Sequence, residues 1–91
     1  MLARIIQWNA EKDTLLRLDA SRGGVGLAEC AVAIEEGRIL DELPNPARTG
    51  QRIFVLEFGG YAYVVPYVTD GDVIFLKTVF PSRKHTAEYL E

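Results

Sequence analysis

The residues best suited to chemistry lie near the C-terminus, where Ser82 precedes Arg83, Lys84 and His85. Pro81 ends an apolar strand pattern and serine is a preferred N-cap, so a helix is expected to begin at Arg83. Its first turn then carries three basic residues, where free backbone N–H groups and the helix dipole already favour negative charge. An anion such as a phosphate would be held there. The competing interpretation is a weak helix with solvated basic side chains.

The composition predicts one globular domain that spans residues 1–91. Hydrophobic residues make up 48% of the chain and charged residues 25%, which argues against a disordered protein. The net charge of −3 argues against a generic binder of nucleic-acid backbones, although a local basic patch stays open.

The cysteine and histidine counts limit the chemistry further. A single cysteine, Cys30, cannot form an intramolecular disulfide, and with His85 as the only histidine no metal set is expected. No cofactor is predicted. The longest apolar runs, such as residues 61–68, are too short for a membrane span, and no secretory leader is recognised. A cytoplasmic protein without membrane contact is therefore expected.

The first half of the chain predicts a strand and two helices. A strand is expected over residues 4–8, and Asn9 is a good N-cap for a helix over residues 10–19. After a glycine-rich turn at residues 21–26, apolar residues recur with helical spacing at Leu27, Cys30, Ala31 and Ile34, and Gly37 is placed to end that helix. Cys30 is thereby predicted to be a buried core residue rather than a nucleophile.

The second half predicts an antiparallel meander. A strand is expected over residues 38–43, followed by a proline-containing loop of the kind that often borders binding sites. Three further strands are expected, separated by tight turns at Gly59–Gly60 and Asp70–Gly71. They cover residues 52–58, 61–68 and 73–80.

Two-residue turns would set the register of this meander. Arg52 would lie opposite Tyr67, and Tyr67 opposite Ile74. On this register Arg52, Tyr63, Tyr67 and Thr78 share one face of the sheet. Val64 pairs with Lys77 on the other face, where Glu57 is a candidate ion-pair partner of the lysine. Pro66 requires a bulge or an unpaired side because proline has no N–H group.

The predicted fold class is α+β, with two N-terminal helices packed on a mostly antiparallel β-meander sheet and a short C-terminal helix, and the helices are expected on one face of the sheet. Four stretches resemble the BrnT-like toxins of bacterial type II toxin–antitoxin systems, which belong to the RelE-like ribonuclease fold. These stretches are Trp8–Lys12, Ala33–Asp41, Gln51–Ile53 and Phe75–Lys84. The resemblance implies a metal-independent endoribonuclease that is restrained by a cognate antitoxin, with basic residues of the sheet and the C-terminus holding RNA.

Cleavage of RNA without a metal requires activation of a ribose 2′-OH, neutralisation of the charge on the phosphorane and protonation of the departing 5′ oxygen. Arg83 is the first candidate for the phosphate clamp because its guanidinium can bind two oxygens, and Arg52 is the second. Lys77 and Lys84 would add positive charge. Histidine titrates nearest neutrality, so His85 is the candidate acid or base.

Aromatic side chains complete the set of candidates. Tyr67 and Tyr89, with Tyr63, could stack on unpaired bases or orient the 2′-OH. Tyrosine in a sheet is also ordinary core material, which is the better interpretation of Tyr63. Each candidate cation could equally be a surface residue.

A second hypothesis is a non-catalytic interaction module that binds a partner chain, because the acidic composition departs from that of RNA-cutting toxins. The enzyme would be favoured by a cluster of basic residues around one concavity, namely Arg52, Arg83, Lys84 and His85. The interaction module would be favoured if these residues were dispersed beside an exposed apolar patch. A ribosome-bound messenger RNA as substrate and a homo-oligomeric state both stay open.

Overall fold

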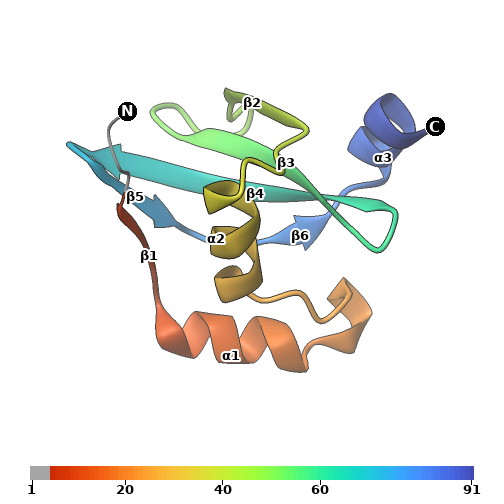
Figure 1. Ribbon diagram of the computed structural model, residues 1–91, viewed down its shortest axis with the longest axis horizontal. Coiled ribbons are helices and arrows are strands. Elements are labelled where there is room, and N and C mark those ends of the chain that lie inside the picture. Colours follow the sequence, from red (N-terminus) through yellow and green to blue (C-terminus); the bar gives the residue numbers. More distant parts are fainter. Residues whose placement is uncertain (1–4) are drawn as a thin grey trace.

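The computed structural model describes residues 5–91 and has α+β architecture (Figure 1). Arg4, expected in the first strand, lies outside these residues. Along the chain the elements are β1 (Ile5–Trp8), α1 (Ala10–Leu18), the 3-10 turn η1 (Ala20–Arg22), α2 (Leu27–Glu35), β2 (Asp41–Pro44), β3 (Arg52–Phe58), β4 (Tyr61–Asp70), β5 (Val73–Leu76), β6 (Phe80–Pro81) and α3 (Arg83–Leu90).

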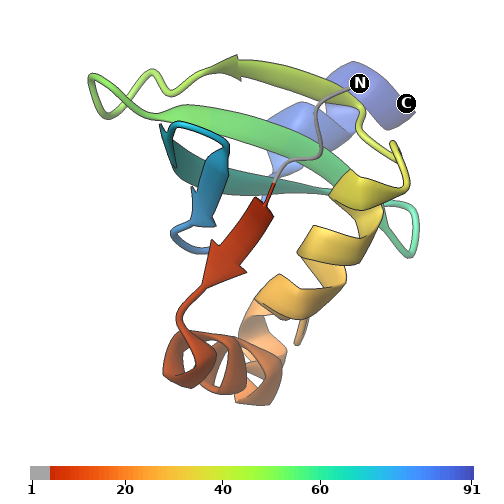
Figure 2. The same cartoon turned by 60° about the vertical axis from the view of Figure 1, so that its left-hand side comes forward.

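The strands form one mixed six-stranded sheet in the order β1-β5-β4-β3-β2, with β6 paired to β4 beyond the end of β5. β1 runs parallel to β5, beside which it lies in Figure 2, and the other pairs are antiparallel. α1 and α2 carry the chain from β1 at one edge of the sheet to β2 at the other edge, and the meander β2–β5 then brings it back beside β1. The mostly antiparallel sheet is therefore confirmed, with a parallel edge.

The helices cover both faces of the sheet, not one face as the sequence suggested. α1 and α2 pack on the face that carries Phe54, Val65 and Tyr67, where the larger core cluster lies. α3 packs on the opposite face, where Tyr89 contributes to a smaller cluster around Val55. In Figure 1 α1 lies below the strands and α3 lies at the upper right, far from α1. Alternation of side chains along each strand separates the two clusters.

The predicted N-caps are confirmed at both ends of the chain. The Asn9 side chain accepts a hydrogen bond from Lys12 N at 2.9 Å, and α1 begins at Ala10. Ser82 Oγ accepts from His85 N at 3.2 Å, and α3 begins at Arg83. These local bonds satisfy backbone donors that have no partner inside the helix.

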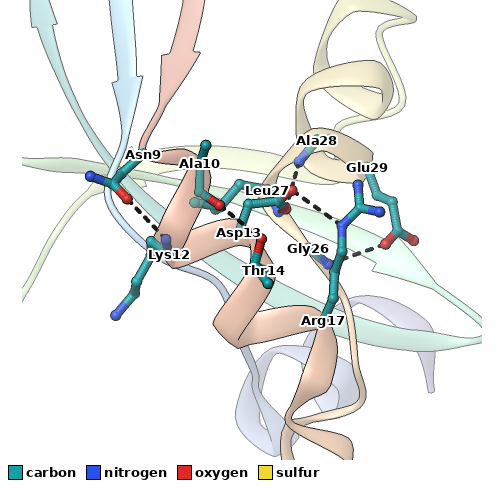
Figure 3. Close-up of polar contacts among 10 residues, drawn as sticks. All are labelled: Asn9, Ala10, Lys12, Asp13, Thr14, Arg17, Gly26, Leu27, Ala28 and Glu29. Atoms are coloured by element: carbon teal, nitrogen blue, oxygen red, sulfur yellow. Dashed lines mark hydrogen bonds and ion pairs between the residues drawn. The ribbon is translucent and has the colours of Figure 1, made fainter.

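α2 begins with a cap that comes from another helix. Asp13 Oδ1 of α1 accepts hydrogen bonds from Leu27 N at 2.6 Å and Ala28 N at 3.3 Å (Figure 3). Arg17 Nε holds the other carboxylate oxygen at 3.2 Å. Gly26 occupies the N-cap position because a Cβ there would meet the carboxylate of Asp13 and the side chain of Arg17. The contact joins α1 to α2.

The buried face and the C-terminal end of α2 follow the sequence prediction. Cys30 is fully buried, and burial raises the pKa of its thiol to about 12. Gly37 ends the helix with φ +75°, and Arg38 N bonds back to Ala33 O at 2.9 Å. The following strand covers Asp41–Pro44 rather than residues 38–43.

The hairpin of β3 and β4 confirms the predicted pairing of Arg52 with Tyr67. The next turn differs. Gly71 and Asp72 form it, because Gly71 adopts φ +60° at its first position, and Tyr67 consequently pairs with Leu76 instead of Ile74. The shift is two residues, so Ile74 still shares the face of Tyr67.

A β-bulge separates β5 from β6. Because of it, the residues that follow β5 lie on other faces of the sheet than predicted. Between the pairs Tyr67–Leu76 and Val64–Phe80, three residues (77–79) stand opposite two on β4. Val79 therefore enters the core beneath α1 and α2. Thr78 was predicted to share the face of Tyr63 and Tyr67, but it lies on the opposite face.

The bulge also corrects the partners predicted for Lys77. Val64 pairs with Phe80, while Lys77 N donates to Pro66 O at 2.8 Å. The carboxylate of Glu57 accepts from Gly60 N instead of pairing with Lys77. The extra residue thus stands beside Pro66, in keeping with the bulge expected there.

Candidate functional site

A groove of about 690 Å³ lies on the face of the sheet opposite α1 and α2. The groove is lined by the loop that follows β2, by the bulge, by the first turn of α3 and by Lys12 of α1. Its floor is apolar and is built from Ile53, Val64, Pro66 and Phe80. Thr78 lines it too, and among residues 5–91 its Oγ1 is a buried side-chain oxygen without a hydrogen-bond partner.

The groove is basic although the protein is acidic. Its lining contains Lys12, Arg48, Lys77 and Lys84, which are four of the ten Lys and Arg residues, and none of the thirteen Asp and Glu residues. The ion pairs within residues 5–91 involve other arginines, so these four cations are not neutralised there. Positive charge concentrated over an apolar floor attracts an anion that also has a flat apolar part.

His85 stands at the α3 end of this groove. Its Nδ1 lies 2.7 Å from Ser82 Oγ, and its ring stacks on Tyr89 with centroids 6.3 Å apart and planes 1° from parallel. The base of α3 is attached to β4 through Thr86, whose Oγ1 accepts from Ala62 N at 2.8 Å. The imidazole therefore extends from a helix that is bonded to the sheet.

The structure does not bring the two predicted arginines into the groove. Arg83 is exposed and is absent from the lining, although its neighbour Lys84 belongs to it. Arg52 lies on the other face, where its Nε is 3.2 Å from the Tyr67 hydroxyl and 3.9 Å from the Glu42 carboxylate. That face has a separate hollow of about 330 Å³. Of the expected cluster of four, Lys84 and His85 meet, and Lys77 joins them.

The two tyrosines predicted to contact RNA are held by carboxylates. The Tyr67 ring is 2% exposed and stacks on Phe54 at 4.3 Å, and its hydroxyl donates to Glu42. Burial, followed by the bond to Glu42, raises the pKa of Tyr67 to about 12. In this position the ring is closed to a stacking base.

The Tyr89 hydroxyl donates to Asp41. This hydrogen bond raises the pKa of Tyr89 to about 12 and holds the pKa of Asp41 below its usual value. Tyr89 is outside the groove lining and lies behind the His85 ring. Its observed contacts are therefore with protein side chains.

Sequence reasoning missed two of the groove cations. Lys12 is in the first turn of α1 and Arg48 is in the loop after β2, far from the C-terminal basic turn in the sequence. The proline-containing loop was a signal for Arg48, because such loops often border sites. Nothing local distinguishes Lys12 from other surface lysines.

Residues 5–91 contain no cluster of His, Cys, Asp and Glu suited to hold a metal ion. No helix in this part of the chain is long and apolar enough to cross a membrane. Comparisons with known protein families, curated proteins and solved structures found no match to this chain. The residues of the groove are therefore the basis for a functional proposal.

Proposed function

We propose that this protein is a metal-independent endoribonuclease, the toxin of a type II toxin–antitoxin pair with a RelE-like fold. The observation that carries the proposal is the groove, in which four cations and a histidine meet without any carboxylate in an acidic chain. RNA matches this groove chemically because it combines phosphates with unpaired bases that can rest on an apolar surface. The proposed compartment is the cytoplasm.

The proposed reaction needs only groups of the RNA and of the groove. The 2′ oxygen forms a bond to the adjacent phosphorus, the bond from phosphorus to the 5′ oxygen breaks, and a 2′,3′-cyclic phosphate remains. The proton of the 2′-OH is lost and the 5′ oxygen gains one, and His85 is the proposed group for one of these transfers. Lys77 and Lys84 would stabilise the additional negative charge of the phosphorane.

The order of elements supports the RelE-like assignment. A strand, two helices, an antiparallel meander and a C-terminal helix follow one another, as the resemblance of residues 8–12 and 75–84 to BrnT-like toxins implies. The proposed antitoxin would cover the groove with acidic groups and thereby restrain the enzyme. Complementary charge is the simplest basis for such recognition.

A non-catalytic interaction module is the second candidate. It is favoured by exposed apolar side chains on α1, where Leu15 is 66% exposed and Leu18 is 77% exposed, and by the absence of Arg52 and Arg83 from the groove lining. On this proposal a partner chain would cover α1, and the groove would bind without cutting.

RNA cleavage by the purified protein in EDTA distinguishes the two. Lys84→Ala and Arg83→Ala form a matched pair, because these adjacent cations lie inside and outside the groove lining. We expect cyclic phosphate ends and a loss of about tenfold or more in Lys84→Ala and in His85→Ala, with little loss in Arg83→Ala. Absence of cleavage by the folded protein, with and without ribosomes, would favour the module.

A further inference from the structure

Ser82 has a second contact besides its cap of α3. Its Oγ accepts a hydrogen bond from His85 N at 3.2 Å and lies 2.7 Å from His85 Nδ1. The same oxygen therefore joins both the backbone and the ring of His85. A serine at an N-cap needs only the backbone bond, so the ring contact is an additional feature.

The bonding capacity of a hydroxyl explains what this contact can do. Ser82 Oγ has one donor hydrogen and two acceptor positions, and His85 N occupies one acceptor. Toward Nδ1 the hydroxyl can donate to the neutral ring or accept from the charged ring. Nδ1 thus keeps its partner in both protonation states, and when that partner is the donor to the neutral ring, Nε2 carries a hydrogen in both states that it can donate to a ligand.

The surroundings hold this pair in place. Ser82 N donates to Ala62 O at 2.9 Å, and Ser82 O accepts from Thr86 Oγ1 at 2.7 Å. On the ring side, Tyr89 stacks on the imidazole and is itself bonded to Asp41 of β2. Both the serine and the ring face are thereby connected to the sheet, which limits rotation of the imidazole.

We propose that Ser82 is a positioning residue, which binds Nδ1 of His85 so that Nε2 is the nitrogen that meets a ligand in the groove. The neutral ring then carries its hydrogen on Nε2, with the Ser82 hydroxyl donating to Nδ1. The proposal rests on the proposed function for the identity of the ligand. The geometry of the pair can be tested without any activity.

The test is the pair of ring ¹⁵N resonances of labelled protein, which are unambiguous because the chain has one histidine. In the wild type and in Ser82→Thr, which keeps the hydroxyl, we expect a hydrogen-bonded Nδ1 and a proton on Nε2. In Ser82→Ala the Nδ1 resonance should shift to that of a nitrogen without a partner. Unchanged ring resonances in Ser82→Ala would overturn the proposal.

Ser82→Asp guards against loss of the helix, because aspartate caps helices as well as serine does. A carboxylate can only accept, so in this variant the neutral ring should move its proton to Nδ1, with the opposite tautomer as the readout. Retention of the wild-type tautomer in folded Ser82→Asp would contradict the proposed contact.

Kinetics separate this proposal from the proposed ribonuclease. If the protein cuts RNA, Ser82→Ala should lower kcat by about tenfold with little change in KM, and Ser82→Thr should retain most of kcat. If the ring resonances shift as expected but no RNA is cleaved, the proposed ribonuclease activity is rejected and the proposed contact between Ser82 and His85 is retained. If RNA is cleaved with the same kcat by the wild type and by Ser82→Ala, the positioning role of Ser82 is rejected and the proposed ribonuclease activity is retained.

Discussion

The carboxylate of Asp13 on α1 accepts the hydrogen bond of Leu27 N at the start of α2, at 2.6 Å. Leu27 is fully buried, so its N–H group depends on this carboxylate for a partner. The relationship makes one side chain both a helix cap and the polar link between two short helices, each of nine residues. Short helices depend on such tertiary contacts because few residues share the cost of nucleation.

We therefore expect Asp13→Ala to lower the free energy of unfolding by about 2 kcal/mol, measured in urea, since a cap is lost and a buried donor is left unpaired. Asp13→Asn is the matched control. It keeps an acceptor oxygen and loses only the ion pair with Arg17, so its loss should be smaller. Equal losses in the two variants would show that the charge, not the cap, is what stabilises this corner.

Gly23 is predicted to tolerate no side chain. It has φ +89°, and a Cβ would overlap the hydroxyl of Tyr63. Gly37 is the matched control, because it also has a positive φ but has open space around the position of a Cβ. Gly37→Ala should cost about 1 to 2 kcal/mol from backbone strain alone, and Gly23→Ala should cost more in the same urea titration.

Removal of the obstructing atom tests the cause. Tyr63→Phe deletes the hydroxyl that lies nearest to the Cβ position of Gly23, so the double variant should lose less stability than the sum of the two single variants. Additive losses would mean that the overlap is relieved in another way.

Alkaline pH should destabilise the fold through Tyr67. Its pKa is raised from 10 to about 12, chiefly by burial, so the phenol of the unfolded chain ionises first. The stability linked to it is complete below about pH 10 and is lost as the pH rises through about 12. The free energy of unfolding between pH 9 and 12 should fall less steeply in Tyr67→Phe, and an identical slope would contradict the shift.

Cys30 should be unreactive in the native protein. Burial raises its pKa to about 12, so the thiolate that reacts with disulfide reagents is scarce and enclosed. Ellman's reagent at neutral pH should modify no thiol in the native state and one in guanidinium chloride. Rapid native reaction would show that α2 opens easily.

RNA binding should depend on salt through the groove cations. Lys77→Gln is expected to weaken binding and to reduce the slope of log K against log salt by about 1, because one phosphate contact is lost. Arg38→Gln is the control, since Arg38 is outside the groove and pairs with Glu36. If the slope of log K against log salt is the same for the wild type and for Lys77→Gln, Lys77 does not contact RNA phosphate.

Local features of the fold were predictable because they depend on neighbours in the chain. The caps at Asn9 and Ser82, the helix end at Gly37 and the burial of Cys30 follow from side-chain chemistry and helical periodicity. The β3–β4 register followed from a two-residue turn, and the presence of basic residues beside His85 was visible directly.

The candidate site was predictable only in part because the pleat alternates. One extra residue at the bulge sends Val79 to the core and Thr78 to the groove, while Arg52 falls on the opposite face from Lys84. No local sequence pattern predicts the extra residue of the bulge. Lys12 and Arg48 reach the groove only through the packing of distant segments.

The sequence by itself thus determined the α+β class, the helix boundaries set by caps, and a basic turn at the start of α3. The tertiary structure alone decided which cations share a surface, that Asp13 caps α2, and that Tyr67 is enclosed. The physical reason is range: capping and turn geometry act within a few residues, whereas the face and the neighbours of a side chain depend on how the whole sheet is paired.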